Sequence, residues 1–122
     1  MTTTLLGLLL LTADAPRIAP RADVERTYDL AELPPADAAR LQGRRARFRV
    51  VLDSDEAELG KYTTVDCLAP DGLAGGVWLL PGRELRDEMT VEATLRIINH
   101  RAAWGFPALR EYRLMDAVVC RP

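Results

Sequence analysis

The sequence predicts an all-β domain with a short N-terminal helix, arranged as a five-stranded, mainly antiparallel barrel. Two stretches carry this prediction. Residues Gly43–Asp53 and Met89–Ile98 each alternate apolar and polar side chains with a period of two, which is typical of half-buried strands. Weaker strand patterns lie between and after them, separated by turn signals. Several short strands spaced in this way favour a closed or partly open barrel.

The size and charge of the chain limit the classes of protein that fit it. The chain has 122 residues, which is the size of a single domain. A chain of this length buries about two-thirds of the surface that it exposes when unfolded, so it needs neither metal nor disulfide to fold. Its net charge of −2 provides no overall electrostatic attraction for nucleic acid.

Residues 1–15 have some features of a signal peptide. The apolar run Leu5–Leu11 has the minimum length of a signal core, and the Ala-Asp-Ala sequence at 13–15 has the form of a cleavage site. No Lys or Arg precedes the run, and Pro16 would follow the cut, so an uncleaved apolar segment is the alternative. Export to the periplasm or cell exterior and retention in the cytoplasm both stay open. The run is too short for a transmembrane helix, which needs about 20 residues.

Residues 16–23 indicate a linker, and residues 24–122 a single domain. Pro34 and Pro35 suit the first turn of a helix that Gly43 ends, and the Pro-Asp-Gly at 70–72 is typical of a turn. A short strand at Val24–Leu30 could precede the barrel. The predicted elements that follow are, in chain order, helix Leu33–Gln42, strand Gly43–Asp53, acidic loop Asp53–Gly60, strand Tyr62–Ala69, strand Gly76–Leu80, strand Met89–Ile98, loop His100–Leu109 and strand Arg110–Val119, which makes five strands in the barrel. The alternation places eight side chains inside the barrel: Ala46, Phe48, Val50, Leu52, Val91, Ala93, Leu95 and Ile97.

From about Leu41 to Val119 the chain resembles the OB-fold. Gly43–Val50 looks like the opening strand of many OB domains, Met89–Leu95 is similar to the fourth strand, and Arg113–Val118 resembles a closing strand. In particular, the chain resembles the tRNA-anticodon-like OB group of small uncharacterised bacterial proteins. It departs from the usual plan because it leaves little room for a helix between the third and fourth strands. The resemblance implies an OB-like barrel, which the helix before the first strand would cap.

The residues available for chemistry make an enzyme a poor fit. Ser54 is the only serine and His100 the only histidine, and neither lies in a recognisable catalytic motif. Cys67 shares parity with Val65, so a core position explains it better than pairing with His100. No phosphate-binding loop is present, since Gly75-Gly76 lacks the Lys and the helix that such a loop requires. We therefore predict no catalytic residue and no cofactor.

The cysteines and the acidic loop give no metal site. Zinc would need about four ligands, and Cys67 and Cys120 form no Cys-x-x-Cys pair. In an exported domain they could form one disulfide, which requires Cα atoms within about 7 Å of each other, and in the cytoplasm they would be small core residues. The acidic loop has Ala57 and Glu58 where a calcium loop of the EF-hand type wants Asp or Asn and then Gly, so a solvated loop is predicted there.

A small OB-like binding module for an unknown protein or small ligand is the main functional hypothesis. The alternative is single-stranded nucleic acid, because OB domains bind it with a basic groove and stacking aromatic rings. The residues for that role would be Arg45, Arg47 and Arg49 with Tyr62 and Trp78. Acidic residues outnumber basic ones, however, and alternating Arg is also typical of a solvated strand that protects a sheet edge.

The loop His100–Leu109 is the most distinctive part of the chain, since it holds the lone histidine, Arg101, Trp104 and Phe106. Each large ring can bury about 150–250 Å², so the favoured expectation is that Trp104 and Phe106 fold back and plug one end of the barrel. The alternative is an exposed aromatic and cationic rim with Tyr62 and Arg101, because this loop borders the ligand site in OB domains.

Overall fold

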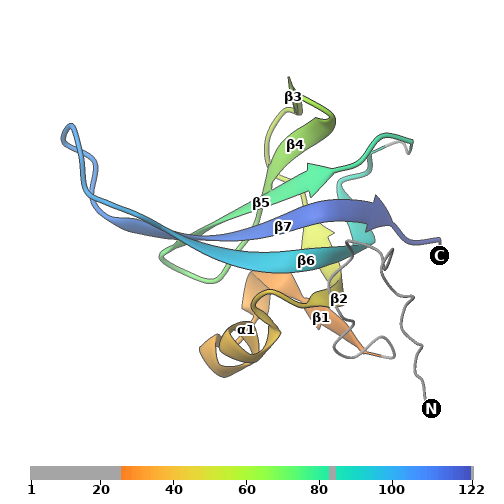
Figure 1. Cartoon of the computed structure of the whole chain (residues 1–122), viewed down its shortest axis with the longest axis horizontal. Coiled ribbons are helices and arrows are strands. Elements are labelled where there is room, and N and C mark those ends of the chain that lie inside the picture. Colours follow the sequence, from red (N-terminus) through yellow and green to blue (C-terminus); the bar gives the residue numbers. More distant parts are fainter. Residues whose placement is uncertain (1–25, 83–84, 122) are drawn as a thin grey trace, which may run out of the picture.

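A computed structural model describes residues 26–82 and 85–121 as one curved β-sheet with a small helical segment beneath it (Figure 1). The predicted signal peptide at 1–15 and the linker at 16–23 lie outside the described residues. The elements are β1 (Thr27–Asp29), η1 (Leu30–Glu32), α1 (Pro35–Leu41), β2 (Arg45–Val51), β3 (Ala57–Leu59), β4 (Tyr62–Cys67), β5 (Leu73–Leu79), β6 (Glu88–His100) and β7 (Leu109–Val119).

The sheet has seven strands in the order β1-β2-β6-β7-β5-β4-β3. Four of the six pairings are antiparallel, as predicted, whereas β1 with β2 and β5 with β7 are parallel. No continuous ladder closes the sheet. The ends of β2 and β4 meet only at an isolated bridge between Leu52 and Cys67, flanked by backbone hydrogen bonds of 3.0 Å from Asp53 to Asp66 and 2.9 Å from Leu68 to Val51.

The predicted barrel of five strands differs from this open sheet of seven, and two of the differences lie at β3 and at the start of β5. β3 lies inside the predicted acidic loop, and all three of its residues are exposed, so the sequence carries no period-two signal there. β5 begins at Leu73 rather than Gly76, because Gly75 and Gly76 pair with β4 despite their low strand propensity. A Cβ atom on Gly75 would lie 2.7 Å from the carbonyl oxygen of Cys67, so only glycine allows β4 to approach this closely.

The core confirms most of the predicted inward positions. Ala46, Phe48 and Val50 of β2 and Val91, Ala93 and Leu95 of β6 are buried. Leu52 and Ile97 are only partly buried, since Leu52 follows the last residue of β2 and Ile97 lies where β6 leaves the body. The predicted helix is present as α1, with Pro35 in its first turn. Its buried Ala38 and Leu41 join Leu30 and Leu33 in the core.

Strand β7 contains a β-bulge at Asp116. Val77 and Leu79 of β5 pair with Leu114 and Ala117, so two residues of β5 oppose three of β7. The register with β6 shifts over the same stretch of β7. Asp116 has a φ of 51°, in the left-handed region that Asp tolerates better than most residues. A bulge bends its strand and increases the local twist, which suits a sheet this curved.

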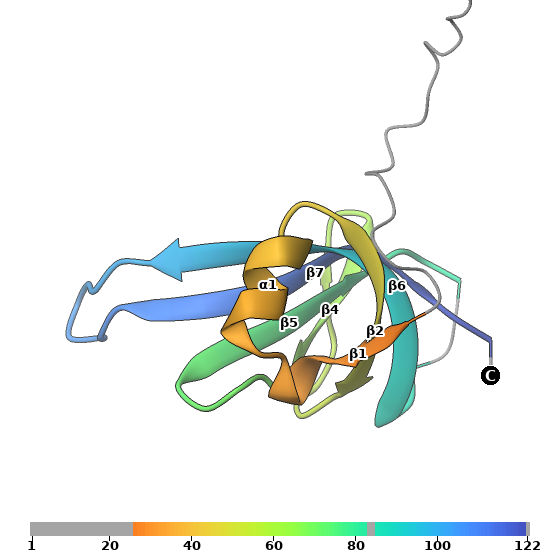
Figure 2. The same ribbon diagram turned by 90° about the horizontal axis from the view of Figure 1, so that it is seen from below.

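Beyond the body, β6 and β7 continue as a two-stranded hairpin that projects from the rest of the molecule (Figures 1 and 2). We call residues 98–111 the arm. The pairing of β6 with β7 runs unbroken from Thr94 with Met115 to His100 with Leu109, so the arm is a direct extension of the central sheet.

Replacing Leu95 with alanine should lower the free energy of unfolding by about 2–5 kcal/mol, because its fully buried side chain would leave a cavity between the strands. Leu59→Ala is the matched control, since Leu59 is 54% exposed and its loss should change stability by less than about 0.5 kcal/mol. Urea denaturation measures both. Equal effects of the two substitutions would contradict the placement of the core.

Candidate functional site

Trp78 is the centre of a polar and aromatic surface on the outer side of β4, β5 and β7. Its half-buried ring meets the ring of Tyr62 edge to face, with centroids 5.5 Å apart and planes at 76°. The guanidinium of Arg113 lies over the indole, 4.7 Å from its centroid. Both contacts are attractive, since a cation or a ring edge favours the electron-rich face of an aromatic ring. The orientation of Trp78 is therefore fixed from two sides.

Glu111 links this surface to the base of the arm. Its Oε1 lies 2.8 Å from Nε2 of His100 and accepts a 3.0 Å hydrogen bond from Arg113. Burial alone would raise the pKa of Glu111, but the hydrogen bonds from Arg113 and His100 lower that pKa below its usual value. A Cβ on Gly76 would lie 3.1 Å from Oε2 of Glu111, so the glycine leaves room for the carboxylate. We call Tyr62, Trp78, His100, Glu111 and Arg113 the aromatic face.

Asp116 is held from two directions. The Tyr62 hydroxyl donates a 2.7 Å hydrogen bond to Oδ1 of Asp116, and this bond raises the pKa of Tyr62 above its usual value. Arg45 reaches over from β2 and donates to the backbone carbonyl of Asp116 at 2.8 Å and to that of Glu92 at 3.0 Å. Its Nε lies 3.5 Å from the Glu92 carboxylate. These contacts fix the bulge on both its side chain and its backbone.

The predicted nucleic-acid surface is not assembled as expected. Arg45 is only 6% exposed and its guanidinium binds protein atoms. Arg47 is half-buried beside Cys120, and Arg49 pairs with Glu88 and with Asp29 at 3.7 Å. Within the sheet, β2 pairs with β1 and β6 rather than with β4 or β5, and Arg45 is linked to Tyr62 through Asp116, which both side chains bind. The three arginines also protect no open edge, because β1 covers that side of β2.

The expected plug of the barrel is wrong. Trp104 is 95% exposed and Phe106 is 73% exposed, at the tip of the arm. Trp104 and Gly105 both have positive φ, 51° and 83°, and Ala103 and Phe106 exchange hydrogen bonds of 3.0 and 2.8 Å. This is a two-residue hairpin turn of type I′, which continues the twist of its strands straight outward. The rings therefore cannot fold back onto the body.

The alternative rim is only partly present. Arg101 lies exposed beside the tip, as expected, and Trp104 and Phe106 are accessible. Tyr62 is not part of that surface, because its hydroxyl binds Asp116, which lies seven positions along β7 from Leu109 (116 − 109). The structure thus separates the predicted residues into two groups. Tyr62 and Trp78 belong to the aromatic face, together with His100 at the base of the arm. Arg101, Trp104 and Phe106 lie further out, at the tip of the arm.

Both cysteines are free thiols. Cys67 lies in β4 and Cys120 follows β7, with β5 between these two strands. Burial raises the pKa of the Cys67 thiol to about 12, so it stays protonated near neutral pH and is no nucleophile. His100 lies on the outer face of the sheet rather than in the core with Cys67, so the two do not form a catalytic pair.

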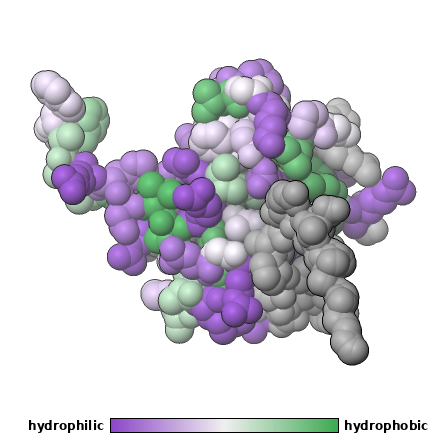
Figure 3. Space-filling view, in the orientation of Figure 1, coloured by the Kyte–Doolittle hydropathy of each residue, from purple (hydrophilic) through white to green (hydrophobic). Residues whose placement is uncertain are grey.

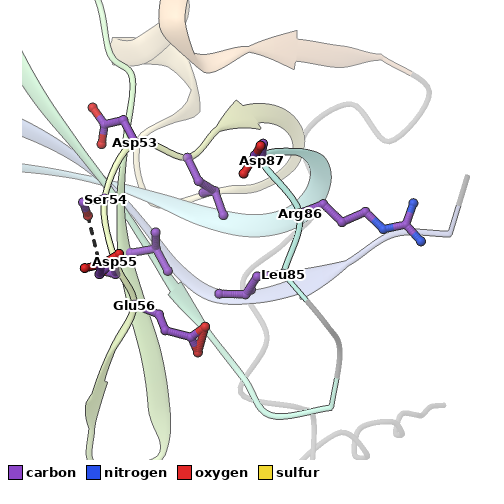
Figure 4. A pocket seen from close by; sticks show the side chains of 9 residues that line it. Asp53, Ser54, Asp55, Glu56, Leu85, Arg86 and Asp87 are labelled. Carbon is purple, nitrogen blue, oxygen red and sulfur yellow. Dashed lines mark hydrogen bonds between the residues drawn. The ribbon is translucent and has the colours of Figure 1, made fainter.

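A pocket of about 580 Å³ lies at the opposite end of the sheet from the arm (Figure 4). Leu52, Val65 and Leu85 supply its apolar part, and the rest of its lining is Asp53, Ser54, Asp55, Glu56, Arg86 and Asp87. The four residues at 53–56 are exposed, as predicted for a solvated loop. Among the described residues, no group of three or more His, Cys, Asp or Glu side chains is arranged to hold a metal ion.

Sequence reasoning missed Glu111, Arg113 and Asp116. The signal that could have identified them is a change of parity in β7. Tyr112 and Leu114 face the core at even positions, whereas Ala117 faces it at an odd position. A change of this kind within one apolar strand indicates a bulge between the two halves, with Asp116 as the residue best suited to it.

Comparisons of the chain with protein-family models, with curated proteins and with solved structures found no match. Within the part of the chain that the structure describes, no helix has the length and apolar character needed to cross a membrane.

Replacing Trp104 with asparagine should leave the protein as stable or stabilise it by about 1 kcal/mol, because a bulky residue is strained at positive φ and Asn-Gly is favoured in this turn. Gly105→Ala is the control. It has open space around it but a φ of 83°, so alanine should destabilise by about 1 kcal/mol. Thermal melts measure both, and a clear loss of stability in Trp104→Asn would mean that the indole packs against the protein.

Proposed function

We propose that the protein is a small, non-catalytic OB-like binding module that holds a protein segment or a small polar ligand against the aromatic face. The strand connections support the fold part of this proposal. β4 and β5 follow β2 as neighbours, joined to it by the Leu52 to Cys67 bridge, and β6 returns to lie beside β2. The resulting order β6-β2-β4-β5 is that of a Greek key.

β7 then pairs with both β6 and β5, which supports the proposal that five of the strands form a partly open Greek-key barrel. A barrel of that description is the OB architecture, and it binds ligands on its second and third strands and the adjoining loops. In this chain those strands are β4 and β5, which carry Tyr62 and Trp78. β1 and β3 are short additions at the two edges.

The observation that carries the functional proposal is the fixed, half-exposed ring of Trp78. Tyr62 and Arg113 hold it in one orientation before any ligand arrives, so a ligand that packs on this face finds the ring already ordered. Preorganised aromatic and arginine side chains are the residues that contribute most to binding energy in protein interfaces.

The charges of this surface favour a polar or protein ligand over nucleic acid. Glu111 neutralises Arg113 and contacts His100, and Asp116 adds a second carboxylate beside Tyr62. A phosphate backbone would meet these carboxylates, whereas nucleic-acid sites depend on excess positive charge. The three arginines of β2 would have supplied that charge, but Arg45 binds the carbonyl of Asp116 and Arg49 pairs with Asp29. Arg47 is half-buried beside Cys120.

The polar groups of the described residues also support a binding role over catalysis. The Cys67 thiol is buried and protonated, and the Ser54 hydroxyl accepts a 3.2 Å hydrogen bond from the backbone of Asp66. His100 contacts Glu111, but Cys67 and Ser54 lie elsewhere, so this histidine activates neither of them.

The test is an array of peptides, oligosaccharides and single-stranded oligonucleotides probed with the wild type and with Trp78→Leu. We expect the wild type to bind peptides or oligosaccharides, and Trp78→Leu to weaken that binding at least tenfold, as for an aromatic anchor. Arg44→Gln is the control, because Arg44 is exposed and lies outside the aromatic face. The wild type, Trp78→Leu and Arg44→Gln must unfold at similar temperatures for the comparison of their binding to be valid.

Equal binding by the wild type and Trp78→Leu would contradict the proposed site. Binding only to oligonucleotides, with an affinity that falls steeply with salt, would favour the nucleic-acid alternative instead.

A further inference from the structure

The tip of the arm exposes an unusually apolar surface. Between Arg101 and Arg110 the sequence is Ala-Ala-Trp-Gly-Phe-Pro-Ala-Leu, and every one of these residues is exposed. The indole N–H of Trp104 is the only side-chain group among them that can form a hydrogen bond. In Figure 3 the pale and green surface of the tip stands apart from the mostly purple body. Exposed apolar surface of this kind marks an interaction site.

The conformation of the tip costs folding free energy, and the exposed ring of Trp104 makes no packing contact that would offset this cost. Trp104 combines a φ of 51° with 95% exposure, so its backbone is strained and its ring contacts solvent. Asparagine would suit the turn better. Strain retained at an exposed aromatic residue points to a function outside the fold.

Two arginines, Arg101 and Arg110, place positive charge at the base of the tip. Arg101 forms no ion pair within the described part of the chain, and Arg110 donates only to the side-chain oxygen of Asn99, at 3.1 Å. Residues 93–110 contain no Asp or Glu. The first carboxylate beyond them, Glu111, is neutralised by Arg113 and contacts His100. The arm is therefore cationic although the whole chain has a net charge of −2.

We propose that the arm docks the protein on an anionic lipid bilayer, with Trp104 and Phe106 inserted at the interface and Arg101 and Arg110 on the lipid headgroups. The spacing fits this arrangement. Trp104 lies three positions beyond Arg101, and a strand rises about 3.3 Å per residue, so the tip extends about 10 Å past the first arginine. Amphipathic segments at membrane surfaces bury their apolar face about 5–10 Å deep.

A bilayer fits the tip better than a protein pocket does. Protein interfaces carry on the order of ten hydrogen bonds that fix their register, and the tip offers one side-chain donor. Lipid requires that backbone groups be satisfied internally, and Ala103 and Phe106 already exchange both of their hydrogen bonds across the turn. Tryptophan is also enriched where membrane meets water, with arginine nearby.

The experiment uses the full chain with Trp78→Phe, which leaves Trp104 as the single tryptophan of the two. The protein is mixed with vesicles of phosphatidylcholine alone or with 30% phosphatidylglycerol, a composition we choose to supply negative charge, and then sedimented. We expect co-sedimentation and a blue shift of Trp104 fluorescence with the anionic vesicles only, together with quenching by brominated lipids. Raising the salt concentration should reverse all three effects.

Two variants separate the contributions. Arg101→Gln with Arg110→Gln should weaken binding to anionic vesicles by roughly 25-fold, since each basic residue near such a surface contributes about fivefold. The charge-matched control is Arg44→Gln with Arg86→Gln, two exposed arginines away from the arm, and it should bind within about threefold of the parent. Phe106→Ser should weaken binding of the parent protein to anionic vesicles and reduce the blue shift of Trp104, because it removes one of the two rings that enter the interface.

The apolar run Leu5–Leu11 provides a second source of lipid affinity, so the fluorescence of Trp104 decides the outcome. No change in Trp104 emission on sedimented vesicles would overturn the proposal, as would equal binding by the arm variants and the control. Absence of any vesicle binding at low salt would overturn it as well.

Discussion

The hydrogen bonds from Tyr62 and Arg45 to Asp116 are the interaction on which the rest of the structure depends. β7 must pair with β6 on one side and β5 on the other while the sheet curves strongly between them. The bulge at Asp116 permits this, because it resets the alternation so that Leu114 and Ala117 both face the core. Tyr62 fixes its carboxylate and Arg45 its carbonyl, from strands on opposite sides of β7.

Arginines on the outer face of the sheet have different partners. Near the bulge, polar side chains bind other protein atoms, and Arg45 is the clearest case. Away from the bulge, Arg113 orders Trp78 but leaves its ring half-exposed, and further along the arm Arg101 has no ion pair among the described residues. Residues of one chemical type therefore differ in their contacts: Arg45 binds backbone carbonyls, whereas Arg113 packs on an aromatic ring.

The sequence predicts the local structure well and the global arrangement poorly. The two long strands follow from alternation, because one face of each is buried, and the helix follows from its prolines and glycine. β3 could not be predicted, since nothing in Ala57–Leu59 faces the core. The burial of Arg45 was also hidden. It depends on a residue 71 positions away, whose bulge no period-two pattern reveals.

The direction of the arm was also not predictable from the sequence. Aromatic rings usually fold inward, which favoured the plug, and only the backbone of the turn sends Trp104 and Phe106 outward. Trp-Gly is an uncommon pair for a type I′ turn, so propensity concealed the hairpin that the pairing of β6 with β7 makes obvious. The candidate residues were thus mostly identified, but their division between the aromatic face and the arm required the structure.

A double-mutant cycle on the bulge tests the account most directly. Arg45→Met, Tyr62→Phe and the pair are compared by urea denaturation at pH 7. We predict a large loss from Arg45→Met, of at least about 2 kcal/mol, because it removes the hydrogen bonds that a buried guanidinium donates to the carbonyls of Glu92 and Asp116. We also predict that the two losses are not additive, by more than about 0.5 kcal/mol, since both side chains hold one residue. Additive losses would contradict the claim that Tyr62 and Arg45 act together on Asp116.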